Sequence, residues 1–130
     1  MNRKGFTLVE IMIVVAIIAL LASIAIPNLL RAKVSANDAA AQSALKSLST
    51  ACETYATGHD GAYPGDEASL TNATPPYMNK AYDGNLVNGF NYDLSGLSSA
   101  GYTISATPLD IGTSGTTTFI VTTGGVLTPD

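Results

Sequence analysis

The sequence has few of the groups from which an enzyme or a metal site is built. It contains one cysteine, Cys52, and one histidine, His59, among 130 residues. A lone cysteine cannot form an intrachain disulfide, and no Cys/His spacing typical of a zinc site is present. The sequence also lacks a P-loop, a Gly-rich dinucleotide turn and a Ser/His/Asp set with a second histidine. We therefore expect a protein that is not an enzyme and that has no cofactor.

Charge is also scarce. Charged residues make up 12% of the chain and hydrophobic residues 46%, and ten acidic against six basic residues give a net charge of -4. An acidic chain is a poor general ligand for a phosphate backbone, so there is no strong nucleic-acid signal. The length leaves room for one domain. We expect core packing, not a stacking surface, from the later tyrosines, which are Tyr63, Tyr77, Tyr82, Tyr92 and Tyr102.

The hydrophobic residues are concentrated in one run, from Phe6 to Leu30, with Glu10 as its single charged residue. As a helix this run spans roughly 37 Å at ~1.5 Å per residue, which is enough to cross a bilayer. A basic start precedes it, but the run is too long for a secretory signal and no small-residue cleavage site follows. The run predicts a transmembrane helix, for which a plain membrane anchor is the simplest explanation.

Two residues in this run are unusual for a plain anchor. Glu10 lies about one turn inside the run, where an ionisable residue is costly and usually has a partner or a function. The alternative is that Glu10 lies near the membrane interface, protonated or reaching toward water. Pro27 removes a backbone hydrogen bond and is expected to kink or loosen the helix around residues 24–29. Basic residues flank both ends of the run, so charge does not determine its membrane orientation.

The residues from Lys4 to Ile18 resemble the prepilin leader and helix start of type IV pilins and pseudopilins. They read KGFTLVE followed by IMIVVAII, after a short basic leader. A glycine precedes a phenylalanine, a glutamate follows four residues later, and Pro27 comes late in the apolar run. The resemblance covers about the first 35 residues. It implies that a prepilin peptidase cuts after Gly5, removes residues 1–5 and methylates the new amine of Phe6.

The same resemblance implies a role for Glu10 in assembly. Cleavage creates a cationic amine on Phe6, and an amine and a carboxylate in an apolar environment each gain from an opposite partner. The family pattern implies that Glu10 of one subunit meets the Phe6 amine of a neighbour as the subunit leaves the inner membrane for a helical filament. Thr7 either accepts a hydrogen bond in this cluster or is only a helix-start residue. The stretch around Pro27 is implied to lose helical hydrogen bonds in the filament.

Residues 31–57 are predicted to continue the helix as an amphipathic half. Apolar residues recur at helical spacing and form one stripe, which predicts packing on a sheet: Ala41, Leu45, Leu48, Cys52 and Tyr55. Other faces carry Asp38, Gln42, Lys46, Ser49 and Glu53. Cys52 lies on the stripe, so we expect it to be a small buried hydrophobe. His59 is interpreted as a residue of the helix end.

The rest of the chain predicts a small sheet. Residues 58–88 are interpreted as a connecting loop with one short helix at 67–72, because Pro and Gly punctuate them. Alternating apolar residues predict strands at 89–94, 102–106 and 116–123, and Gly124-Gly125 predicts a hairpin into 126–127. Residues 89–130 would then form an antiparallel β-meander packed on the helix. The predicted fold class is α+β and pilin-like.

These features together predict a structural subunit of a type IV pilus. It would be a single-pass precursor in the bacterial inner membrane and then part of an extracellular pilus, or fimbrium, used for adhesion, surface motility or DNA uptake. The resemblance implies a homo-oligomeric filament, a prepilin peptidase and an inner-membrane assembly platform driven by a separate ATPase.

Three alternatives stay open. They are a pseudopilin of a type II secretion system, a minor pilin with a binding role, and a membrane anchor that carries a small ligand-binding domain. Major pseudopilins often hold calcium in a C-terminal loop, for which Asp83, Asn85 and Asp110 could supply oxygen ligands. No EF-hand spacing is present, and Asp-Gly is more often a turn, so we expect no calcium site.

Overall fold

The structure is a computed structural model that describes residues 2–130. It divides into two compact units, Met1–Ala32 and Lys33–Asp130. Helix α1 (Leu8–Gly58) begins in the first unit and ends in the second, and its helical assignment continues through Pro27. The predicted effect of Pro27 in a filament stays a prediction.

The first unit is an exposed apolar helix with a short irregular leader. Residues 2–7 have no regular secondary structure, and α1 begins at Leu8. Every large apolar side chain from Phe6 to Leu30 is at least 50% exposed. By length and composition this part of α1 is able to cross a membrane. Such a surface requires either lipid or other protein to cover it, because exposed apolar area on this scale is unfavourable in water.

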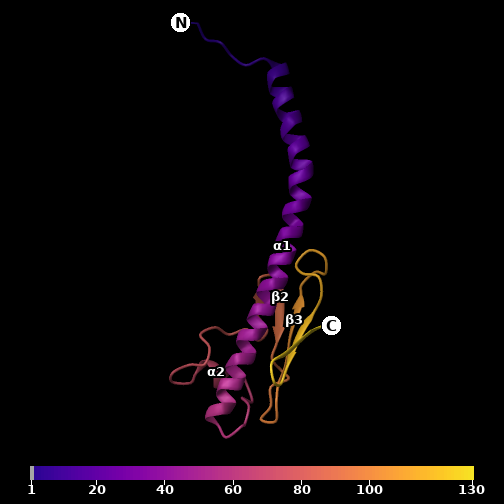
Figure 1. The fold of residues 1–130 in the computed structure, drawn as a ribbon. Helices are drawn as coiled ribbons and strands as arrows, with labels where there is room; N and C mark the ends of the chain where they lie inside the picture. The colour runs from indigo at the N-terminus through magenta and orange to yellow at the C-terminus, as the bar shows by residue number, and fades with distance from the viewer. Residues whose placement is uncertain (1) are drawn as a thin grey trace. The chain divides into compact units, whose positions relative to one another are not determined.

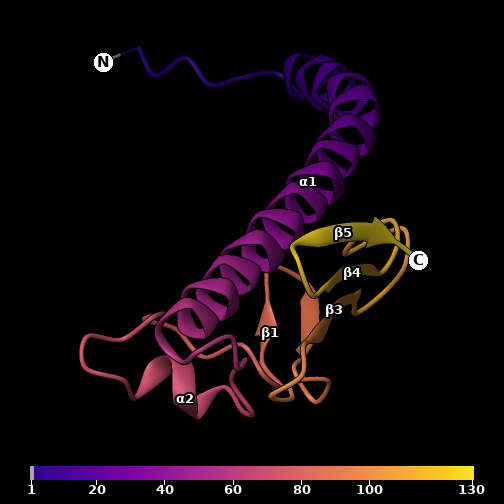
Figure 2. The same cartoon turned by 60° about the horizontal axis from the view of Figure 1, so that its bottom comes forward.

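The second unit combines the C-terminal half of α1 with a five-stranded antiparallel sheet (Figure 1). The strands follow each other in chain order across the sheet, and each pairs with the next. They are β1 (Leu86–Val87), β2 (Phe90–Asp93), β3 (Thr103–Pro108), β4 (Phe119–Thr122) and β5 (Val126–Pro129). A short helix, α2 (Ala68–Thr71), lies in the segment that joins α1 to the sheet (Figure 2). The predicted α+β meander is therefore confirmed.

The core lies between one face of the sheet and the apolar stripe of α1. Inward residues alternate along the strands, so Phe90 and Tyr92 of β2 are buried and their neighbours are exposed. The predicted helix stripe is buried from Ala41 to Cys52, while Tyr55 at its end is half-buried against the core. Alternation at period two on the strands and at helical spacing on α1 thus brings the same two faces together.

The structure differs from the predicted elements at several places. Strand β1 falls inside the stretch predicted to be a loop, and β4 is shorter than predicted because residues 116–118 are not in the strand. Ser49, which the sequence places off the apolar stripe, is only 5% exposed, because its small side chain packs against the hydroxyl of Tyr102, the residue before β3. The Gly124-Gly125 hairpin is confirmed. Its two glycines have φ of 86° and 77°. Because Thr122 pairs with Val126, the loop is residues 123–125, one residue longer than the two-residue turn that the sequence predicts.

Candidate functional site

The start of α1 holds the one charged side chain of the apolar segment in a fixed hydrogen-bond arrangement. The Glu10 carboxylate oxygen Oε2 accepts a bond from the Thr7 backbone N–H at 2.6 Å and from the Thr7 hydroxyl at 2.9 Å. In return, the Glu10 N–H donates to Thr7 Oγ1 at 3.2 Å. Because Leu8 is the first helical residue, Thr7 occupies the N-cap position and Glu10 the third helical position. This reciprocal pattern is a capping box.

The capping box satisfies backbone donors that the start of a helix otherwise leaves without partners. It also fixes the Glu10 carboxylate beside the backbone of Thr7, one residue after Phe6. The sequence pattern Thr-x-x-Glu before an apolar run carries this signal. The two interpretations of Thr7 from the sequence were a member of an intersubunit cluster and a helix-start residue, and neither identified the capping box. The capping box uses Glu10 Oε2.

The predicted cleavage site lies in the irregular leader ahead of the helix. Gly5 and Phe6 are exposed, and Phe6 is 85% exposed. A methyl group added at Gly5 would meet no atom within 4 Å, and its backbone φ is not in the left-handed region. The fold therefore does not require glycine at this position. Any requirement for glycine at Gly5 comes from whatever acts on the chain, not from folding.

A second polar cluster joins α1 to the sheet in the second unit. Glu53 accepts hydrogen bonds from the Tyr102 hydroxyl at 2.8 Å, the Gly124 N–H at 2.8 Å and the Tyr63 hydroxyl at 3.1 Å. The Tyr102 hydroxyl lies 2.7 Å from Ser49 Oγ. Because its single hydrogen goes to Glu53, the Tyr102 oxygen accepts from Ser49. It also accepts from the backbone N–H of Gly125, at 3.2 Å.

The cluster shifts the acidities of its members. Partial burial by itself raises the pKa of Glu53, but the bonds from Tyr102, Gly124 and Tyr63 outweigh it and hold that pKa below its usual value. Burial raises the pKa of Tyr102 to about 12, so the hydroxyl stays protonated and donates to Glu53. The cluster thus clamps the β4–β5 hairpin onto α1. The helix-face pattern gave no signal for it, since Glu53 lies off the apolar stripe.

The other side chains that could be reactive have structural roles in the second unit. Cys52 is fully buried, and burial raises the pKa of its thiol to about 12, so it is not a reactive thiolate. The Asp83 carboxylate accepts the Leu94 N–H at 2.9 Å, so it binds the backbone directly after β2. Within residues 2–130, no three His, Cys, Asp or Glu side chains are grouped in a way that could hold a metal ion.

Comparison with known proteins supports the interpretation of the N-terminal segment. Residues 1–26 match the family model of the prokaryotic N-terminal methylation motif. The type IV wide pilus major component PilA4 of Thermus thermophilus is 44% identical over 69 residues, which are 53% of this chain and 52% of that protein. The type IV major pilin PilA of Myxococcus xanthus is 46% identical over 59 residues, which are 45% of this chain and 27% of that protein.

Secretion proteins are also similar. The type II secretion system core protein G of Vibrio cholerae is 36% identical over 90 residues, which are 66% of this chain and 61% of that protein. The chain thus spans about half or less of the first pilin relatives and somewhat more of this secretion protein. All three relatives are named as components of pili or secretion systems and none as an enzyme. These names agree with the expectation of a structural, non-enzymatic protein.

Proposed function

Since this chain belongs to the type IV pilin and pseudopilin family, we propose that it is the structural subunit of a type IV pilus, cut after Gly5 and methylated at Phe6. The observation that carries the proposal is the pairing of an exposed apolar helix with a fixed carboxylate at its start. The surface from Phe6 to Leu30 has to be covered, first by lipid in the inner membrane and then by the same segment of other subunits.

The leader geometry supports cleavage between Gly5 and Phe6. Residues 2–6 are exposed and have no regular structure, so a protease can take up this stretch in an extended form without unfolding α1. Removal of residues 1–5 leaves the new Phe6 amine adjacent to Thr7. That amine is then a cation at the entrance of an apolar helix, within one turn of Glu10.

We assign Glu10 to subunit assembly. In the isolated chain, its Oε2 atom is held by Thr7 of the same helix. A carboxylate oxygen accepts more than one bond, so the Phe6 amine of a neighbouring copy can join the cluster while the capping box persists. The pair would set the axial register between copies, because a charge that misses its partner stays uncompensated in an apolar environment. Thr7 is then a positioning residue that orients the carboxylate.

Two variants test these roles separately. Gly5→Ser is expected to leave folding unchanged, because the site is open, and to block processing, so that only precursor-sized protein accumulates. Glu10→Ala is expected to be cut and membrane-bound but not to form homopolymers. Glu10→Gln keeps one hydrogen-bond acceptor for the capping box but removes the charge. It therefore separates the role of Glu10 in subunit register from its role in helix capping. Normal filaments from Glu10→Ala would overturn the assembly role, and a mature-sized Gly5→Ser band would overturn the cleavage site.

A second function, as a pseudopilin of a type II secretion system, is favoured by a separate observation. The alignment with the V. cholerae secretion protein reaches further along this chain, over 90 residues, than the alignments with the two pilins. Both candidate functions use the same processing and the same apolar helix. They differ in whether the filament extends from the cell, so recovery of the subunit from sheared surface fibres distinguishes them.

A further inference from the structure

The loop that joins β3 to β4 presents two apolar side chains to solvent on either side of an acidic one. Leu109 is 57% exposed and Ile111 is 75% exposed, and Asp110 between them is also exposed. The hydrogen bonds of Asp110 to Thr113 and Ser114 use its backbone, which leaves its carboxylate on the surface. We call residues 109–111 the loop tip. Exposed apolar side chains held together at a loop end are typical of a contact surface.

The loop behind this tip is held rigidly against α1. The Asn37 side-chain amide donates to the Ser114 carbonyl at 2.8 Å, and Asp38 accepts from the N–H and hydroxyl of Thr116 at 2.9 and 2.7 Å. The loop closes on itself by a bond from the Gly112 N–H to the Gly115 carbonyl at 2.7 Å. A loop fixed in this way loses little conformational entropy on binding, which favours association.

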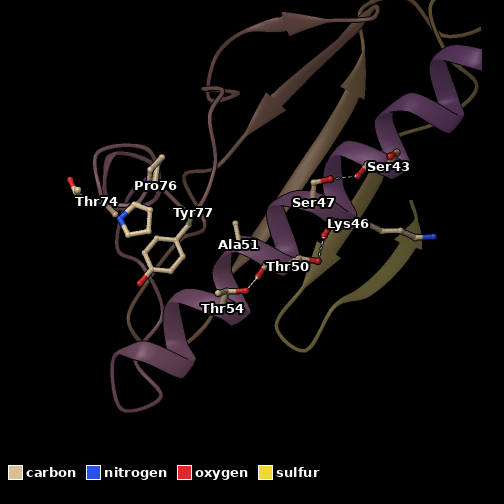
Figure 3. Close-up of a pocket in the computed structure, with 11 residues that line it drawn as sticks. Ser43, Lys46, Ser47, Thr50, Ala51, Thr54, Thr74, Pro76 and Tyr77 are labelled. Carbon is tan, nitrogen blue, oxygen red and sulfur yellow. Dashed lines mark hydrogen bonds between the residues drawn. The ribbon is translucent and has the colours of Figure 1, made fainter.

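A groove lies further along the same helix. Figure 3 shows one wall of Ser and Thr side chains from α1 and a second wall from the connecting segment. The groove has a volume of about 680 Å³. Its lining includes Ser43, Ser47, Thr50, Thr54, Pro76 and Tyr77. The hydroxyls of Ser47, Thr50 and Thr54 donate to helix carbonyls four residues earlier. Their donor hydrogens are therefore already used, and their oxygens remain as acceptors. The apolar part of the lining comes from Ala51, Ala73, Pro75 and Pro76.

The groove has one basic side chain at its rim. Lys46 lines the groove, and its side chain extends to the side of α1 away from Tyr77 (Figure 3). The groove therefore combines an apolar floor, which includes Ala51, with one cation at its edge. The loop tip is its complement in both respects, since it has two apolar side chains around one carboxylate. Complementary charge favours the correct partner and register more than it adds affinity.

The loop of one copy cannot fill the groove of that same copy. Each helical residue turns the axis by about 100°, so the Asn37–Asp38 attachment and the four groove residues of α1 lie roughly 160° apart around the helix. Their centres are also offset by roughly 16 Å along it. A contact between two such separate surfaces is heterologous. In copies that share one direction it leads to an open helical assembly, not a closed dimer.

We propose that the loop tip of one copy seats in the helix groove of the next copy, with Asp110 beside Lys46 of that copy. This inference rests on the proposed function, because it is the parallel alignment of subunits in a filament that makes the contact repeat. It adds a contact between the second units to the contact made by the apolar helices.

Crosslinking in sheared fibres tests the contact. Cysteines are introduced together by Ile111→Cys and Ser47→Cys, and the fibres are treated with a short bismaleimide; native Cys52 is buried and does not react. We expect a ladder of dimers, trimers and higher multimers on a denaturing gel. The control replaces Ile111→Cys with Leu86→Cys, which is 54% exposed on β1, and is expected to give monomers. Ladders of equal intensity from the two cysteine pairs would overturn the contact. So would a gel on which fibres carrying Ile111→Cys and Ser47→Cys show monomers and no multimers.

Charge exchange provides an independent readout. Asp110→Lys is expected to lower fibre yield about two- to fivefold, as the loss of an exposed pair does, and Lys46→Asp in the same chain is expected to restore it. Lys80→Asp in place of Lys46→Asp is the matched control and is expected not to restore it. Rescue by both second changes, or by neither, would contradict the pairing. If the unmodified chain forms no fibres at all, it is the proposed function that fails.

Discussion

Two buried tyrosines, one in β2 and one immediately before β3, offer a sharp test of the clamp between α1 and the β4–β5 hairpin. Tyr102 and Tyr92 are each only 2% exposed, and a change to phenylalanine removes one hydroxyl from each. The Tyr102 hydroxyl bonds to Glu53, Ser49 and the Gly125 N–H. Among residues 2–130, the buried Tyr92 hydroxyl has no hydrogen-bond partner. The two substitutions are chemically identical and the two side chains are equally buried. A difference in stability between the variants therefore reports the hydrogen bonds of the hydroxyl and not its burial.

The expected magnitudes follow from these contacts. Tyr102→Phe leaves the Ser49 hydroxyl without its partner and removes one of the three donors to Glu53. It also removes one of the two acceptors of the Gly125 N–H, whose bond to the Thr122 carbonyl at 3.0 Å remains. With a net contribution of about 0.5–1.5 kcal/mol per bond, the loss is about 2 kcal/mol. In a domain of this size that lowers the melting temperature by roughly 8–16 °C. Tyr92→Phe is expected to be neutral or slightly stabilising, because it removes a buried polar group that has no partner.

Thermal unfolding of the detergent-solubilised chain, followed by near-ultraviolet circular dichroism, measures both variants. Hydrogen exchange at the Gly125 amide adds a local readout, since that N–H donates to both the Tyr102 hydroxyl and the Thr122 carbonyl and loses the first of these bonds in Tyr102→Phe. The exchange rate of the Gly125 amide should be higher in Tyr102→Phe than in the unmodified chain, and it should be unchanged in Tyr92→Phe. Equal loss of stability in the two variants, or a greater loss in Tyr92→Phe, would refute the clamp.

Three further results are expected. The hydrogen bonds of Glu53 lower its pKa, so they stabilise the fold above the unfolded-state pKa, and this stabilisation is lost as the pH falls through the folded-state pKa. Glu53→Gln should therefore reduce the drop in melting temperature between pH 7 and pH 3. An unchanged drop would contradict this expectation. Gly115→Ala should destabilise by about 1–3 kcal/mol, because its methyl group would come within 2.3 Å of the Phe90 ring, while Gly65→Ala, which meets nothing within 4 Å, should have no effect in the same melts. Cys52 should resist a water-soluble maleimide in native protein and react after unfolding, and rapid native labelling would contradict its burial.

Much of the fold follows from periodicity in the sequence. The stripe from Ala41 to Cys52 and the alternation of Phe90 and Tyr92 each bury one face, so α1 and the sheet could be predicted together. The Gly124-Gly125 turn was readable because two consecutive left-handed residues almost require glycine. Strand β1 could not be read, since two residues are too few to show a pattern and β1 is defined by its pairing with β2.

The polar contacts were harder to predict than the elements. Glu53 meets Tyr63, Tyr102 and Gly124, which are between 10 and 71 residues away in the sequence, and no local pattern encodes such contacts. The hydrogen bonds that join Asn37 and Asp38 to the β3–β4 loop connect residues more than 70 positions apart and were not predicted for the same reason. The Thr7–Glu10 capping box is the opposite case. It is local, its sequence pattern is explicit, and its geometry was available from the sequence.

The measurement that tests the central claim most directly is mass spectrometry of fibres sheared from intact cells that express the unmodified chain. A subunit that begins at N-methylated Phe6 and is the main species of the sheared fraction is the predicted result. A subunit that retains residues 1–5, or that begins elsewhere, would contradict processing after Gly5. A correctly processed subunit that is abundant in the envelope but missing from the sheared fraction would contradict the extracellular pilus and support the pseudopilin.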